Sequence, residues 1–144
     1  MKKKTTVGIN GFGRIGRNVF RLLLHHPSIE VVAVNDLADT KTLSHLLKYD
    51  SIHGVLKEDI AYTEGEVSIA GKNVKFSSEK NIEDISWRNV DIVVECTGKF
   101  KTKKQLENHL KNGAKRVILS VPPLEDDIKT VVLGVNDNIL TLKI

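Results

Sequence analysis

Three glycines near the start of the chain, Gly11, Gly13 and Gly16, constrain its fold more than any other feature. Their G-x-G-x-x-G spacing fits the turn that joins the first strand of a βαβ unit to its helix. The first glycine permits a tight turn, the second lets a pyrophosphate approach the backbone, and the third lets helix and strand pack closely. A side chain at any of the three positions is expected to interfere with the corresponding turn, ligand approach or packing.

The residues around these glycines supply the context that the motif needs, because the same spacing also occurs in kinase loops and by chance. Residues 5–10 form an apolar run typical of a strand, 14–25 carry apolar residues at helical spacing, and 30–35 read as a second strand. Free N–H groups at the start of the predicted helix would bind an anion. The pattern therefore predicts a dinucleotide-binding βαβ unit.

Asp36 follows the second predicted strand, 20 positions after Gly16. An acidic residue about 20 positions after the glycines reaches the 2′-hydroxyl of the adenosine ribose. A carboxylate accepts hydrogen bonds from this hydroxyl and repels a 2′-phosphate, so NAD is favoured over NADP. The alternative interpretation is that Asp36 only caps the next turn, where Asp is common.

The rest of the chain alternates strand and helix patterns, with one insertion of different period. Residues 66–77 alternate apolar and polar side chains around Ala70-Gly71-Lys72, as a β-hairpin does. The other predicted elements are helices over 39–48 and 102–112 and strands over 90–95, 116–120 and 130–133. We therefore expect an α/β, Rossmann-type doubly wound, mostly parallel sheet with helices on both faces and an inserted β-hairpin.

Size and composition indicate one domain of a cytoplasmic protein. The chain has 144 residues and a single cysteine, which agrees with a reducing compartment. The net charge of +4 comes from scattered lysines, which favours a solvated surface over a nucleic-acid site. Neither a signal peptide nor an apolar run of roughly 20 residues is present, so no membrane partner is expected. The histidines and cysteine lack metal-ligand spacing.

Five segments together resemble one family. They are VGINGFGRIGR at 7–17, NDL at 35–37, YDSIHG at 49–54, ECTG at 95–98 and AKRVILS at 114–120. In this order they resemble the N-terminal, NAD-binding half of the phosphorylating glyceraldehyde-3-phosphate dehydrogenases, which belong to glycolysis. Erythrose-4-phosphate dehydrogenases are similar in this half.

The resemblance implies a role for each motif in holding NAD. The backbone N–H groups of Arg14 and Ile15 would bind the pyrophosphate, and Asp36 would hold the adenosine ribose. The other implied cofactor residues are Gly11, Gly13 and Gly16 in the loop, Leu37 and Phe100 beside adenine, Lys80 at the adenine end, and Thr97, Gly98 and Ser120 on the path toward nicotinamide.

The family's catalytic cysteine and histidine belong to a half that these 144 residues do not contain. We therefore expect residues 1–144 to be one NAD-binding domain that is inactive alone, with the catalytic half as its partner in a full-length homotetramer. Cys96, where the family usually has Ser, is interpreted as a small core residue, and His53 as a structural hydrogen-bonding residue. A free-standing, non-catalytic NAD-binding module is the competing hypothesis.

Overall fold

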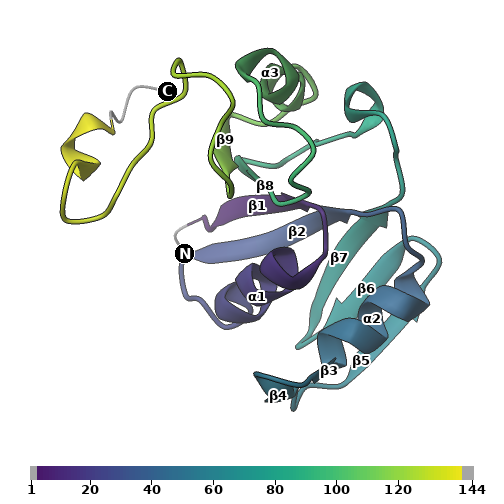
Figure 1. Cartoon of the computed structure of the whole chain (residues 1–144). Helices are drawn as coiled ribbons and strands as arrows, with labels where there is room; N and C mark the ends of the chain where they lie inside the picture. The colour runs from purple at the N-terminus through teal and green to yellow at the C-terminus, as the bar shows by residue number, and fades with distance from the viewer. Residues whose placement is uncertain (1–2, 141–144) are drawn as a thin grey trace.

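A seven-stranded sheet forms the centre of the computed structural model, which describes residues 3–140. Its strand order is β5-β6-β7-β2-β1-β8-β9 (Figure 1). Five neighbouring strands are parallel: β7 (Lys72–Ser77), β2 (Ile29–Asn35), β1 (Thr5–Asn10), β8 (Ile92–Glu95) and β9 (Arg116–Leu119). The chain runs outward from β1 in one direction through β2 and β7, then returns to the other side of β1 with β8. This is the doubly wound, Rossmann-type fold that the sequence predicts.

The predicted hairpin is confirmed as β6 (Glu66–Ile69) and β7, joined at Ala70 and Gly71. Both linking residues have positive φ, as a two-residue hairpin turn of type I′ requires. The hairpin is not a separate insertion, because β7 also pairs in parallel with β2. A strand that the sequence analysis missed, β5 (Ile60–Thr63), extends the antiparallel edge through β6.

Helices cover both faces of the sheet, as expected (Figure 1). On one face α1 (Arg14–Leu23) and α2 (Thr40–Lys48) contribute Phe20, Leu43 and Leu47 to a core with β1 and β2. On the other face, α3 (Lys103–Lys111) and a 3-10 turn, η1 (Ile82–Asp84), lie over a second core built around Trp87 and Val93.

Side chains fix where two of these helices begin. The Asp39 carboxylate caps α2 by accepting a hydrogen bond from the Thr42 N–H. Thr102 and Gln105 form a capping box on α3. The first helix ends at Leu23 rather than residue 25, because the Leu24 N–H turns back to the Arg21 carbonyl in a tighter turn. After α2, β3 (Tyr49–Asp50) and β4 (Gly54–Val55) form a separate two-stranded sheet.

The prediction of a strand over 130–133 is wrong. Asn136 satisfies the local backbone instead, since its side chain accepts from the Val132 N–H at 2.6 Å and donates to the Thr130 carbonyl at 2.9 Å. The segment therefore turns and leads to a short 3-10 helix, η2 (Asp137–Ile139).

Within residues 3–140, β9 has a strand partner on only one side. In the same range no helix is long and apolar enough to span a membrane.

The glycine loop gives a direct test of the packing. A Cβ atom on Gly16 would lie far inside contact distance of the Gly11 carbonyl oxygen, whereas one on Gly13 meets nothing within 4 Å. We expect Gly16→Ala to lower the free energy of unfolding by about 2–3 kcal/mol through overpacking. The matched variant Gly13→Ala should cost at most about 1 kcal/mol, the usual loss at a helix N-cap. Urea unfolding measures both, and equal losses would contradict this account.

Candidate functional site

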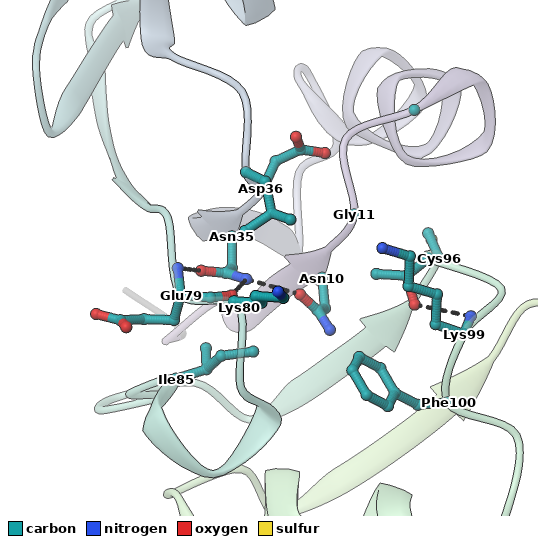
Figure 2. Close-up of a pocket in the computed structure, with 13 residues that line it drawn as sticks. Asn10, Gly11, Asn35, Asp36, Glu79, Lys80, Ile85, Cys96, Lys99 and Phe100 are labelled. Carbon is teal, nitrogen blue, oxygen red and sulfur yellow. Dashed lines mark hydrogen bonds between the residues drawn. The ribbon is translucent and has the colours of Figure 1, made fainter.

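A cleft of about 350 Å³ lies at the carboxyl ends of β1, β2 and β8 (Figure 2). The strand order reverses between β1 and β8, and open α/β sheets bind ligands at such a switch point. The predicted residues that line the cleft are Gly11, Gly13, Asp36, Leu37, Lys80, Thr97 and Phe100. The fold thus gathers seven of the twelve predicted cofactor residues around one cavity.

The glycine loop forms one wall, and each glycine has a different reason to be glycine. Gly11 has a φ of +94°, and a Cβ there would lie 2.8 Å from the Thr97 backbone nitrogen. Gly13 is the N-cap of α1 and has no side chain to cap it. The space beside Gly13 and the first N–H groups of α1 are therefore available to an anionic ligand.

Asp36 faces the glycine loop from the end of β2. Its Oδ2 atom accepts a hydrogen bond from the Phe12 N–H at 2.7 Å, and Oδ1 accepts from the Ala38 N–H at 2.9 Å. The second bond is the local turn cap that the alternative interpretation proposed, and the first ties Asp36 to the loop. A carboxylate offers about four acceptor positions, so Asp36 retains acceptor capacity for a ribose hydroxyl.

The remaining predicted residues lie close by but outside the cleft lining. Arg14, Ile15 and Gly16 belong to the first turn of α1, behind Gly13, and Gly98 follows Thr97. Ser120 lies one strand further out, where its hydroxyl donates to the Glu95 carbonyl at 2.9 Å. Of this group, Gly16 acts through packing, because its contact with the Gly11 carbonyl brings helix and loop together.

Six further residues line the cleft that the sequence analysis did not assign to the cofactor: Asn10, Asn35, Glu79, Ile85, Cys96 and Lys99. Asn10 and Asn35 end β1 and β2 after runs of mostly apolar residues, a position at which buried amides signal a polar network. Asn35 Nδ2 donates to Asn10 Oδ1 at 3.0 Å, and Asn35 Oδ1 accepts from the Glu79 N–H and the Ser77 hydroxyl. These bonds hold the ends of β1, β2 and β7 together.

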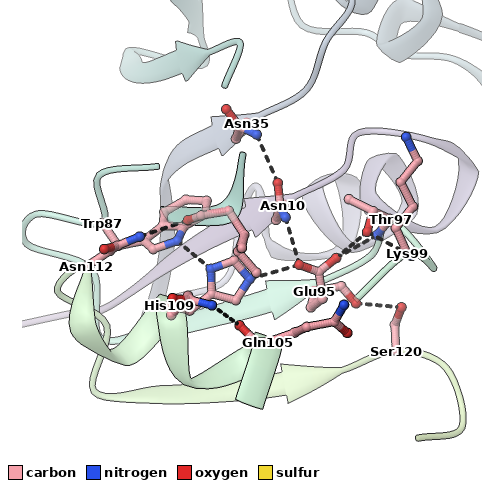
Figure 3. Close-up of polar contacts among 12 residues, drawn as sticks. Asn10, Asn35, Trp87, Glu95, Thr97, Lys99, Gln105, His109, Asn112 and Ser120 are labelled. Carbon is pink, nitrogen blue, oxygen red and sulfur yellow. Dashed lines mark hydrogen bonds and ion pairs between the residues drawn. The ribbon is translucent and has the colours of Figure 1, made fainter. Parts of the chain in front are cut away.

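Glu95, the last residue of β8, is fully buried behind the cleft (Figure 3). Its Oε1 atom accepts from Asn10 Nδ2 at 2.7 Å and from His109 Nε2 at 2.8 Å. Its Oε2 atom accepts from the N–H of Thr97 at 2.9 Å and from its hydroxyl at 2.7 Å. Every acceptor direction of this buried carboxylate is therefore used.

Trp87 sets the proton position on His109. The indole Nε1–H donates to His109 Nδ1 at 2.8 Å, so Nδ1 must be an acceptor without a proton. The single ring proton then lies on Nε2 and points at Glu95. His109 is consequently neutral in this arrangement, and Glu95 is a buried anion held by neutral donors.

Two pKa shifts describe the chemistry of this region. Burial acts to raise the pKa of Glu95, but the hydrogen bonds from His109, Thr97 and Asn10 outweigh it and leave that pKa lowered. Burial raises the pKa of the Cys96 thiol, the nearby Glu95 charge adds to this effect, and a hydrogen bond with Ser120 opposes it. Cys96 is therefore a protonated thiol, which agrees with its interpretation as a structural residue.

The fold and this site define a dinucleotide-binding domain of the Rossmann class. Residues 5–103 match the family described as "Glyceraldehyde 3-phosphate dehydrogenase, NAD binding domain". The chain therefore belongs to the glyceraldehyde-3-phosphate dehydrogenase family, whose cofactor is NAD.

Bacterial relatives support the same assignment. The chain is 54% identical over 135 residues to "Glyceraldehyde-3-phosphate dehydrogenase 2" of Streptomyces avermitilis. It is 52% identical over 134 residues to the enzyme of Geobacillus stearothermophilus and 48% identical over 136 residues to that of Thermotoga maritima. Each match covers 92% of this chain and 40% of the relative, so the chain spans less than half the length of these proteins.

Replacing Glu95 tests the buried network. In Glu95→Gln, an NH₂ group replaces one of the two carboxylate oxygens. It then faces either the donors of Asn10 and His109 or the donors of Thr97, so at least one buried donor loses its acceptor. We expect the free energy of unfolding at pH 7 to fall by about 2–5 kcal/mol. The control Glu79→Gln changes an exposed side chain and should stay within about 0.5 kcal/mol. Similar losses of unfolding free energy in the two variants would refute a stabilising role for the buried network.

The same variant has a pH signature. Because the folded-state pKa of Glu95 is lowered from 4.5, its contribution to stability is complete above pH 4.5 and is lost as pH falls toward the lowered value. The stability gap between the wild-type chain and Glu95→Gln should therefore narrow below pH 4.5. A gap that widens in acid would contradict the direction of the shift.

Proposed function

We propose that this chain is the NAD-binding domain, spanning residues 1–144, of a cytoplasmic glyceraldehyde-3-phosphate dehydrogenase. The observation that carries the proposal is the pairing of an uncapped α1 N-terminus with the Asp36 carboxylate across one cleft. NAD needs both features, since its pyrophosphate is an anion and its adenosine ribose offers hydroxyl donors.

Each wall of the cleft would take one part of NAD. The N–H groups of Arg14 and Ile15 would bind the pyrophosphate, beside the open space at Gly13. Asp36 would accept from the ribose, Leu37 and Phe100 would flank adenine, and Lys80 would lie at the adenine end. Thr97, Gly98 and Ser120 would form the path toward nicotinamide. Gly11 and Gly16 would keep the loop close enough for these contacts.

The chain's own contribution to the reaction is to bind and orient the cofactor. NAD supplies a hydride acceptor when bound. In the whole protein, this orientation would serve the oxidation and phosphorylation of glyceraldehyde 3-phosphate to 1,3-bisphosphoglycerate. That reaction would use a nucleophile from the catalytic half, within a homotetramer. The proposal gives neither a membrane nor a specific nucleic acid a role as partner.

Cofactor preference tests the role of Asp36. Calorimetric titration should show NAD binding at least about tenfold tighter than NADP, because the carboxylate repels a 2′-phosphate. Asp36→Asn removes the charge, and its amide oxygen can still accept from the Phe12 N–H while the exposed Ala38 N–H turns to water. The preference for NAD over NADP should therefore narrow while the glycine loop keeps its structure. Equal or stronger binding of NADP by the wild-type chain would defeat this role.

Gly13 tests the pyrophosphate site separately from folding. The Cβ atom of a bulky side chain in Gly13→Val would meet no atom within 4 Å beyond its chain neighbours, so the fold should persist while NAD binding is abolished. Circular dichroism checks the fold, and Lys129→Ala, which does not alter the cleft lining, serves as the control variant. Undiminished NAD affinity in folded Gly13→Val would exclude a pyrophosphate site beside Gly13.

Activity should be at background for the 144 residues alone. Cys96 is the sole cysteine, and its raised pKa makes it a poor nucleophile. Phosphate-dependent NADH production from glyceraldehyde 3-phosphate should therefore match a control without protein. Turnover that disappears in Cys96→Ser would show that Cys96 is catalytic after all.

A further inference from the structure

The Glu95 network, defined as Asn10, Trp87, Glu95, Thr97 and His109, links the cleft to the buried core beneath α3 (Figure 3). Asn10 and Thr97 line the cleft, whereas Trp87 and His109 do not. We propose that Glu95, kept ionised by His109, is a positioning residue that sets the Thr97 turn and the Asn10 amide for the cofactor. This inference rests on the proposed NAD-binding function.

One carboxylate controls both sides of the switch point. Oε2 receives both donors of Thr97, whose backbone nitrogen is the atom nearest to a Cβ placed on Gly11. Oε1 receives the Asn10 amide, which in turn accepts from Asn35 at the end of β2. A change at Glu95 therefore moves the glycine loop and the opposite wall together.

Ionisation is essential to this arrangement, because all four groups that contact the carboxylate are donors. A proton on Oε1 would displace the donor of Asn10 or His109, and a proton on Oε2 would force the Thr97 hydroxyl to turn from donor to acceptor. The titratable group that faces Glu95 from α3 is His109, and Cys96 is its neighbour in the chain. Trp87 occupies His109 Nδ1, so the imidazole acts as a neutral donor.

Stability alone does not explain why a charged residue occupies this buried position. A buried charge without a cationic partner carries a desolvation cost, and well-packed apolar residues at such sites are often as stable or more stable. Four bonds directed from β1, from the turn after β8 and from α3 instead fix the geometry of the site. The residues that receive this geometry are cleft-lining ones, which points to positioning of the ligand.

The test compares two substitutions of His109, which lies outside the cleft lining. His109→Leu removes the donor to Glu95, so burial should dominate and raise the carboxyl pKa. NAD affinity, measured by calorimetry from pH 5.5 to 8.5, should then fall with decreasing pH, by up to about tenfold per pH unit below the raised pKa. His109→Gln can donate to Glu95 and accept from Trp87 with its amide, and should keep the flat wild-type profile.

Each outcome has a distinct meaning. A wild-type chain that does not bind NAD defeats the proposed function itself. If the wild-type chain binds NAD, the comparison of the two folded variants tests the positioning role alone. Equal NAD affinity and equal absence of pH dependence in His109→Leu and His109→Gln would overturn that role. Four of the five histidines remain in both variants, so their titration cancels in the comparison.

A second measurement does not require either variant to fold. In the wild-type chain, the carboxyl ¹³C resonance of Glu95 should stay at its ionised position from pH 5.5 to 8.5. Trp87 is the only tryptophan, so its indole N–H gives a single signal. That signal should shift on addition of NAD, although Trp87 lies outside the cleft. Titration of Glu95 near neutral pH, or an indole signal unmoved by saturating NAD, would refute the inference.

Discussion

The close approach of the glycine loop to its neighbours is the constraint on which the site depends. The Gly16 backbone packs against the Gly11 carbonyl, and Gly11 packs against Thr97, so α1, β1 and β8 converge with no room for side chains between them. This brings the N-terminus of α1 to the switch point of the sheet. The position of the proposed anion site therefore follows from backbone contacts alone.

Two carboxylates then hold this loop from opposite sides. Asp36 bonds the Phe12 N–H within the loop, and Glu95 bonds the Thr97 turn against which the loop packs. Phe12 is itself anchored by edge-to-face contacts with Phe20 and Phe76, at ring-centroid distances of 5.5 and 5.4 Å. The loop is thus organised by the protein alone, which reduces the ordering cost of binding a ligand.

Local sequence patterns predicted the parallel strands, the helices and the hairpin, because their periodicity and caps agree with the tertiary structure. They failed where tertiary context decides. The segment 130–133 has strand-like residues, yet Asn136 satisfies its backbone in a turn. Residues 60–63 are a strand because β6 pairs with them, although most of their side chains are exposed.

The candidate site divides in the same way. Gly11, Gly13 and Asp36 are recognisable because their spacing encodes a turn and a reach along one βαβ unit. Glu95 and His109 are separated by 14 positions and belong to different elements, so their bond exists only after β8 and α3 pack together. No spacing rule could identify Trp87 as the residue that fixes the His109 tautomer. Local sequence motifs thus identify the residues proposed to bind the cofactor, whereas the residues proposed to position them come together only when the chain folds.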